Sequence, residues 1–185
     1  LPEALRAQLL AASADLSSLA EEVVTTLGAY HRNGFKLRIG TRSLVCGLQP
    51  HIMGIVNCTD DSFYEGSRFL GDSAVDRAAS MVEQGASIID VGGESTRPGG
   101  DPVNAELELD RVLPVIERLS VAVDVPISID TSKADVAAAA IGAGATMVND
   151  IHGLAADPDL AGVVADAGVP IVLMHMRGAP GRMYE

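Results

Sequence analysis

The chain has 185 residues, the size of one domain, and its formal net charge at pH 7 is −12. Hydrophobic residues make up 48% of it and no long polar tract is present, so its composition excludes global disorder. No basic patch is visible, which argues against nucleic acid as a partner. No apolar run approaches the roughly 18 residues of a membrane span, so no membrane association is expected.

The cysteine content indicates a reducing compartment. Cys46 and Cys58 are too few for a disulfide framework, and the N-terminus lacks the pattern of a signal peptide. We therefore expect a cytoplasmic protein with free thiols. The histidines and cysteines lie far apart without ligand spacing, so a zinc site is not expected.

The first 50 residues are predicted to form an extension. Leucines recur at helical spacing over residues 1–30, which indicates a helix that packs at the edge of the domain. Residues 35–48 alternate apolar and polar side chains on either side of Gly40, which is typical of a β-hairpin. We assign residues 1–50 to this extension and residues 51–185 to the main domain.

After Pro50, apolar runs of strand length alternate with helical stretches. The predicted strands are 51–56, 87–91, 126–129, 145–148 and 169–174, and the predicted helices are 73–84, 105–119, 133–141 and 159–166. Capping residues support these helices, Asn104 and Asp157 among them. Strands that are joined by helices predict βαβ units and a parallel sheet.

Two α/β architectures use such units, the open doubly wound sheet and the (β/α)₈ barrel. Both collect function at the carboxyl ends of the strands. A closed barrel needs eight strands in about 250 residues. The sequence contains about five, stops at Glu185 and starts with Leu rather than Met. It therefore describes an open sheet or an incomplete barrel, and we expect it to be an excerpt of a longer chain.

Polar residues follow the first two predicted strands. Asn57 and the acidic residues after it offer hard oxygen ligands that suit Mg²⁺, in a predicted loop that runs to Asp72. The second strand is followed by paired glycines, the hydroxyl groups of Ser95 and Thr96, and Arg97, whose planar guanidinium fits a phosphate. These loops predict a site for an anionic ligand.

The third and fourth predicted strands deliver an acid and an amide to the same cleft. Asp130 and Asn149 can together bind a flat heterocycle with mixed donors and acceptors. Helix capping is the alternative role for residues of these types. Asp150 is better suited to capping or to bracing a loop.

These strand ends together resemble dihydropteroate synthase. The family's first signature, MGILNVTPDSF, appears at residues 53–63 as MGIVNCTDDSF, and residues 90–99 match the second signature as DVGGESTRPG. The pairs at 130–131 and 149–150 and the run LMHM at 173–176 also match. The resemblance covers residues 51–185 and implies a (β/α)₈ barrel.

The resemblance also implies a reaction, in which 4-aminobenzoate displaces diphosphate from 6-hydroxymethyl-7,8-dihydropterin diphosphate. Asp130 and Asn149 would bind the pterin, with Asp130 as the catalytic group that stabilises positive charge on the pterin methylene. Asn57 would bind the diphosphate through Mg²⁺ and Thr96 would bind it directly. The resemblance implies that four further residues close over the substrates and shape the aminobenzoate pocket, namely Asp61, Phe63, Arg97 and Pro98. In the family this pocket is a sulfonamide target.

Two departures from the family pattern stand out. Asp60 replaces the usual Pro, which adds loop freedom and negative charge. The later barrel strands, with their pterin-binding Lys and diphosphate-binding Arg-x-His, are not in this sequence, nor are the helices that usually form a homodimer. We expect an active homodimeric synthase whose chain continues. A pterin-binding methyltransferase that uses methyltetrahydrofolate and a non-catalytic pterin-binding paralogue are the alternatives.

Overall fold

The computed structural model describes residues 14–47, 49–58, 67–94 and 103–175. By their contacts, the residues group into two compact units. One comprises Leu1–Lys36 with Val45–Pro50, and the other comprises Leu37–Leu44 with His51–Glu185. None of the described helices combines the length and the apolar character that crossing a membrane requires.

The first unit contains helix α2, Ala14–Tyr30, where the leucine spacing predicted a helix. Strands β1, Phe35–Ile39, and β2, Arg42–Cys46, pair as the predicted hairpin. Gly40 has a φ of +57° at the hairpin turn, a conformation that glycine adopts without a steric penalty. The hairpin tip, Leu37–Leu44, belongs to the second unit.

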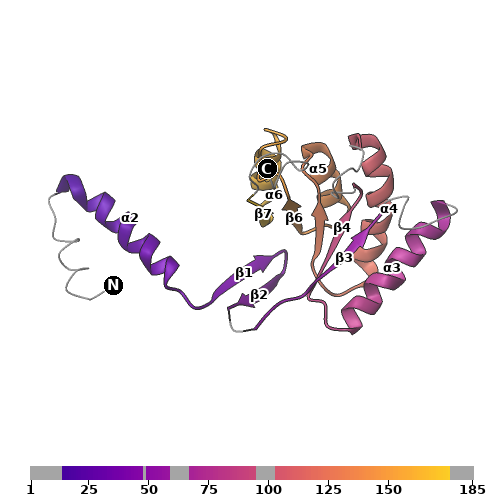
Figure 1. The fold of residues 1–185 in the computed structure, drawn as a ribbon, viewed down its shortest axis with the longest axis horizontal. Coiled ribbons are helices and arrows are strands. Elements are labelled where there is room, and N and C mark those ends of the chain that lie inside the picture. Colours follow the sequence, from indigo (N-terminus) through magenta and orange to yellow (C-terminus); the bar gives the residue numbers. More distant parts are fainter. Residues whose placement is uncertain (1–13, 48, 59–66, 95–102, 176–185) are drawn as a thin grey trace, which may run out of the picture. The chain divides into compact units, whose positions relative to one another are not determined.

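A parallel sheet forms the centre of the second unit (Figure 1). Its five described strands pair in the order of the chain, and they are β3 Met53–Asn57, β4 Ile88–Gly92, β5 Ile127–Asp130, β6 Met147–Asp150 and β7 Ile171–Leu173. A doubly wound sheet reverses its strand order at a switch point, whereas a barrel adds every strand on the same side. The order therefore identifies a partial barrel rather than an open doubly wound sheet.

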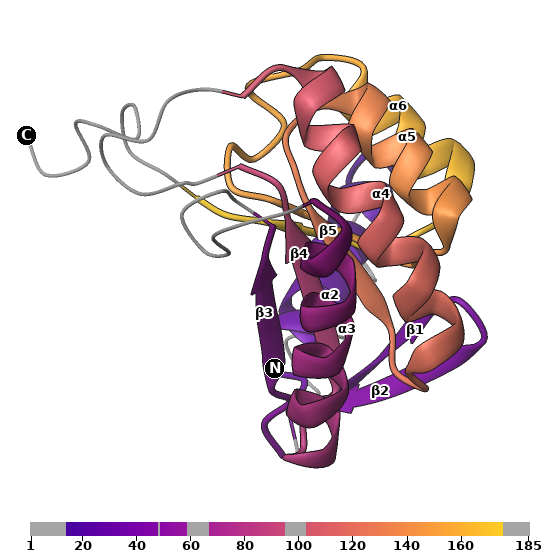
Figure 2. The same cartoon turned by 90° about the vertical axis from the view of Figure 1, so that its right-hand side faces the viewer.

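The helices that connect these strands pack on one face of the sheet (Figure 2). They are α3 Ser67–Glu83, α4 Ala105–Ala122, α5 Ala134–Ala143 and α6 Leu160–Ala167. Alternate strand residues such as Val91, Ile129 and Val148 are completely buried between sheet and helices. The remaining alternate residues face the barrel interior.

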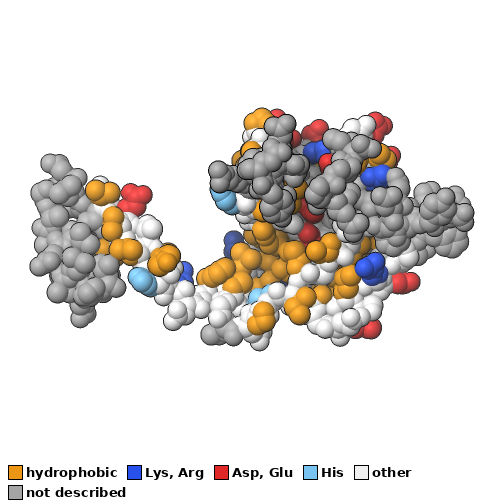
Figure 3. All heavy atoms as spheres, in the orientation of Figure 1, with side chains coloured by type: hydrophobic (Ala, Val, Ile, Leu, Met, Phe, Trp, Pro, Cys, Tyr) orange, Lys and Arg blue, Asp and Glu red, His pale blue; other side chains and the backbone are white. Residues whose placement is uncertain are grey.

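A second, smaller core closes the interior at the amino ends of the strands. Ile39 from the hairpin packs with Ile88 and Met147, and all three are buried. The inward positions on the edge strands β3 and β7 are less covered than those on the inner strands, where Asp90 and Ser128 are buried. Ile55 on β3 is 57% exposed and Val172 on β7 is 39% exposed, and hydrophobic side chains are visible on this unit's surface (Figure 3).

Several element boundaries differ from the sequence predictions. Strands β3, β4 and β5 each end one residue later than predicted, at Asn57, Gly92 and Asp130. Backbone pairing continues past the apolar run, so the polar residues at these ends lie in the sheet and not in loops. Helix α3 begins at Ser67, six residues earlier than predicted, and this shortens the loop that precedes it.

The helix caps were predicted in part. Asn104 caps α4, since its side chain accepts a hydrogen bond from the backbone N–H of Leu107 at 2.8 Å. Asp157 serves the starts of two helices. Its Oδ2 accepts from the N–H of Ala134, at the start of α5, at 2.8 Å, and its Oδ1 accepts from the N–H of Asp159, directly before α6, at 3.0 Å.

Candidate active site

Four residues at the carboxyl ends of neighbouring strands form one row across the sheet. Asn57 on β3 pairs in register with Gly92 on β4, Gly92 with Asp130 on β5, and Asp130 with Asn149 on β6. Paired residues in a parallel sheet project to the same face. Asp130 and Asn149, which were predicted to share one cleft, lie in register on adjacent strands, and Asn57 lies in the same row.

Gly92 keeps the centre of this row open. A Cβ atom at position 92 would lie 3.5 Å from Oδ2 of Asp130 and 3.8 Å from Oδ1 of Asn57. The oxygens of these two side chains therefore flank a space that glycine leaves empty. A planar ligand has room to approach the backbone at this point.

Asp90 lies two residues before Gly92 on the same face of β4, and the sequence analysis did not identify it as a site residue. Its Oδ2 accepts a hydrogen bond from Nδ2 of Asn149 at 3.0 Å. The residue is 3% exposed, and its Oδ1 has no hydrogen-bond partner among the described residues. The sequence feature that could have identified Asp90 is an acidic residue within an apolar strand, because a carboxylate is buried only where a specific interaction compensates for its desolvation.

Burial among several carboxylates raises the pKa of Asp130 to about 7. Burial is the largest cause, and the negative charges of Asp90, Glu108, Asp150 and Glu94 add to it. Burial also raises the pKa of Asp90, although the side chains of Ser128 and Asn149 oppose this effect. A ligand that brings positive charge or N–H donors would relieve the repulsion.

Asp150 braces a loop, as the sequence analysis suggested. The side chain is completely buried. Its Oδ1 accepts from the N–H of His152 at 2.8 Å, and its Oδ2 accepts from the N–H of Leu154 at 2.6 Å. Both carboxylate oxygens thus accept hydrogen bonds from backbone N–H groups. Asp150 therefore holds the loop in place, whereas its neighbour Asn149 faces the candidate site.

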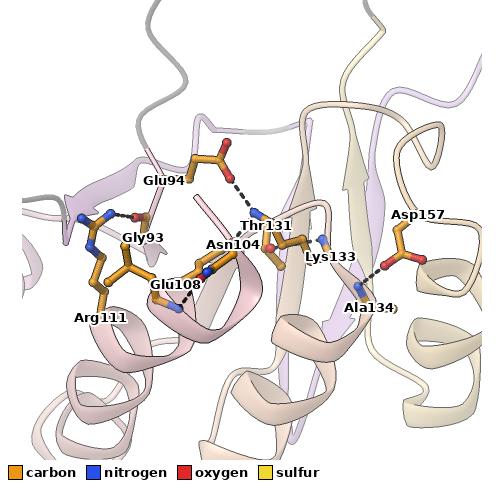
Figure 4. Close-up of polar contacts among 10 residues, drawn as sticks. Gly93, Glu94, Asn104, Glu108, Arg111, Thr131, Lys133, Ala134 and Asp157 are labelled. Carbon is orange, nitrogen blue, oxygen red and sulfur yellow. Dashed lines mark hydrogen bonds and ion pairs between the residues drawn. The ribbon is translucent and has the colours of Figure 1, made fainter. Parts of the chain in front are cut away.

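A second polar cluster lies beside the row, at the amino ends of α4 and α5 (Figure 4). Nζ of Lys133 lies 2.5 Å from Oε2 of Glu94 and 2.5 Å from Oε2 of Glu108. Arg111 donates from Nη1 to the carbonyl oxygen of Gly93 at 2.9 Å. This cluster could not be predicted from the sequence, because Gly93 and Glu94 belong to the second signature whereas Glu108, Arg111 and Lys133 are dispersed along the chain outside it.

The remaining predicted site residues lie outside the described part of the chain, and they are Asp61, Phe63, Thr96, Arg97 and Pro98. The described residues include no group of three or more His, Cys, Asp or Glu side chains that could hold a metal ion. Asn57, the predicted metal ligand, is exposed at the end of β3 and offers a single amide oxygen.

Comparison with known proteins gives this row of residues a context. A family model described as "pterin binding enzyme" matches residues 53–185, which include the whole parallel sheet. The chain belongs to the pterin-binding enzyme family. The match begins at the first residue of β3, so the region that the family model covers coincides with the barrel strands.

Members of the pterin-binding family that are similar to this chain are dihydropteroate synthases, which confirms the resemblance seen in the sequence. The enzyme of Synechocystis is 46% identical over 150 residues, covering 80% of this chain and 52% of its own. That of Bacillus subtilis is 52% identical over 135 residues, covering 72% and 47%. The chain spans about half the length of these relatives.

Solved structures of the same enzyme match the fold. A Xanthomonas albilineans dihydropteroate synthase with 4-aminobenzoic acid aligns with a TM-score of 0.72 at 46% identity, over 77% of this chain and 52% of that one. A Yersinia pestis dihydropteroate synthase in a sulfonamide drug complex aligns with a TM-score of 0.73 at 43% identity, over 81% and 54%.

Proposed function

We propose that the protein is a dihydropteroate synthase that joins 6-hydroxymethyl-7,8-dihydropterin diphosphate to 4-aminobenzoate. The amine nitrogen of 4-aminobenzoate forms a bond to the exocyclic methylene of the pterin. The carbon–oxygen bond to diphosphate breaks, diphosphate leaves with the electron pair, and the nitrogen gives up a proton. The observation that carries the proposal is the row formed by Asn57, Gly92, Asp130 and Asn149. The chain that contains this row is 52% identical over 135 residues to the synthase of Bacillus subtilis.

The pterin ring is proposed to lie over Gly92, between Asp130 and Asn149. Since Nδ2 of Asn149 donates to Asp90, its Oδ1 is left to accept from an N–H of the ring. Asp130 offers a second acceptor and, when ionised, a negative charge close to the reacting methylene. That charge would stabilise the positive charge that develops as diphosphate leaves.

Asn57 is proposed to help hold Mg²⁺ together with the diphosphate of the substrate. Its Oδ1 faces the open space above Gly92, and an uncharged hard oxygen suits a magnesium ion whose other ligands are phosphates and water. The ion would neutralise charge on the leaving group. Because Asn57 is exposed, Asn57→Ala should fold normally and should raise the Mg²⁺ concentration needed for half-maximal turnover.

Residues that follow β3 and β4 in the sequence are assigned their roles by resemblance to the family. Thr96 is assigned to the diphosphate. Asp61, Phe63, Arg97 and Pro98 are assigned to closure over the substrates and to the aminobenzoate pocket. We also propose a homodimer for the full-length protein, and a cytoplasmic location, since both cysteines are free thiols.

A methyltransferase that uses methyltetrahydrofolate would share the pterin slot. It would have no use for the motif at residues 95–98, which by resemblance to dihydropteroate synthases serves diphosphate and 4-aminobenzoate. The similarity to synthases at 46–52% identity also favours the synthase. A non-catalytic pterin-binding protein would still bind the pterin but would not turn it over. The assay must therefore distinguish pterin binding from turnover.

The test measures diphosphate release by the full-length protein with each substrate present or absent, alongside calorimetric binding of the pterin diphosphate. Release that requires 4-aminobenzoate and yields dihydropteroate supports the proposal. Tight pterin binding with no release would identify a non-catalytic pterin-binding protein. Transfer of a methyl group to cobalamin would identify a methyltransferase.

A further inference from the structure

Lys133 joins two carboxylates that come from different parts of the barrel. It precedes α5, whereas Glu94 follows β4 and Glu108 lies in the first turn of α4 (Figure 4). The ammonium lies 2.5 Å from one oxygen of each. The side chain of Glu108 is 1% exposed, that of Lys133 26% and that of Glu94 31%. The contact is therefore largely shielded from water.

A buried carboxylate such as Glu108 is not explained by stability alone. Removing a charge from water is costly, and apolar side chains of similar volume stabilise a fold equally well or better. One oxygen of Glu108, Oε1, has no hydrogen-bond partner among the described residues. The arrangement is better explained by geometric specificity, because an ion pair fixes the positions of the groups that it joins.

The backbone of Gly93 and Glu94 is held from several sides. A Cβ atom at position 93 would lie only 2.9 Å from Cγ of Glu108, so the chain passes directly against α4. Arg111, one turn further along α4, donates to the carbonyl oxygen of Gly93. Lys133 then holds the side chain of Glu94. These contacts fix the last described residues before the sequence motif at 95–98.

The backbone around Lys133 is also held by hydrogen bonds. The backbone N–H of Lys133 donates to Oγ1 of Thr131 at 3.2 Å, and Asp157 accepts from the N–H of Ala134 at 2.8 Å. Lys133 lies three residues after Asp130 in the chain. Its side chain thus links the end of β5, which carries the pterin acid, to the segment that follows β4.

We propose that Lys133, paired with Glu108, is a positioning residue that holds Glu94 and so sets where the chain enters the motif at residues 95–98. This inference rests on the proposed synthase function, in which that motif serves diphosphate and 4-aminobenzoate. Lys133 does not touch the pterin slot itself. Its loss should therefore affect the second substrate more than the pterin.

The experiment replaces the ion pair by apolar side chains of similar size. Lys133→Met alone leaves Glu108 buried without its cation and is expected to destabilise the fold. The double variant Lys133→Met with Glu108→Leu removes both charges and should keep the thermal stability near that of the wild type. Lys133→Arg retains the charge and serves as the conservative rescue. Lys36→Met, at the chain's other lysine, which is exposed, is the matched control.

In the full-length protein, we expect the double variant to raise the KM for 4-aminobenzoate by about tenfold and to change the Kd for pterin diphosphate by less than about twofold. Lys133→Arg should recover most of the KM. Equal losses for both substrates, or an unchanged KM in a folded double variant, would overturn the inference.

Hydrogen exchange provides a readout that does not depend on turnover. In the double variant, the backbone amides of Gly93 and Glu94 should exchange faster than in the wild type, while peptides from α4 and α5 should not. Unchanged exchange at Gly93 and Glu94 contradicts the positioning role. A wild-type protein that releases no diphosphate contradicts the proposed function instead, so the two failures are distinguishable.

Discussion

Asn149 on β6 donates a hydrogen bond to Asp90 on β4, and the 3.0 Å contact passes across strand β5, which lies between them. The two residues are 59 positions apart in the chain. Asp90 can only accept when ionised, so it determines which end of the Asn149 amide faces the ligand. The pair therefore presents an acceptor next to Asp130.

Replacing Asp90 by Asn should weaken pterin binding while leaving the fold intact. An amide at position 90 can donate or accept, so the orientation of the Asn149 amide would no longer be fixed. We expect the Kd for pterin diphosphate to rise about tenfold, in line with the loss of a charge-assisted hydrogen bond. Calorimetry measures this, with the exposed Asp76→Asn on α3 as a control. An affinity equal to that of the wild type would show that Asp90 does not orient Asn149.

The pH dependence of turnover should report Asp130. Its pKa is raised to about 7, first by burial and next by the charge of Asp90. If the ionised form stabilises the transition state, kcat/KM for the pterin substrate should fall about tenfold per pH unit below that value and level off above it. Asp90→Asn removes the second cause and should move this acid limb to lower pH. A limb that stays in place would assign it to another group.

Asp130→Asn should abolish pterin binding and yet stabilise the ligand-free protein at alkaline pH. Because the folded-state pKa lies above the unfolded value of 3.8, folding takes up a proton between these two values, and stability is lost as pH rises through that window. An amide avoids the buried charge. The shift corresponds to about 4 kcal/mol at pH 8. Because Asp130 is partly exposed, solvent screening reduces this effect, and we expect a gain of about 2 kcal/mol in unfolding free energy at pH 8 and almost none at pH 4.

Urea denaturation at both pH values provides this comparison. Asp135→Asn, an exposed acid on α5, is the control and should show no such trend. A pterin affinity for Asp130→Asn within a few-fold of the wild type would place the pterin elsewhere.

Two adjacent glycines should respond differently to alanine. At Gly93 the added methyl group would lie 2.9 Å from Glu108 and Val112, so Gly93→Ala should destabilise the protein by about 1–3 kcal/mol. At Gly92 the nearest atoms are 3.5 Å away, which is an ordinary contact. Gly92→Ala should therefore fold normally but occupy the space between Asp130 and Asn57. Thermal unfolding and pterin calorimetry on both variants test this, and a reversed pattern would refute the assigned site.

Much of the sheet could be predicted from the sequence, because local patterns determine it. Apolar runs of strand length, separated by helices with caps such as Asn104, predicted parallel strands in the correct places. Carboxyl ends of parallel strands share an edge, so the sequence was sufficient to place Asp130 and Asn149 together. The ends of the strands could not be predicted, since backbone pairing extends past the apolar residues to Asn57 and Asp130.

The sequence by itself determined the class of fold, the row of polar strand ends and the family. Only the tertiary structure decided between an open sheet and a barrel, because that choice depends on strand order. It also revealed the contacts of Asp90 with Asn149 and of Lys133 with Glu94 and Glu108. These contacts join residues far apart in the chain, and no local periodicity or spacing encodes which distant side chains meet when a barrel forms.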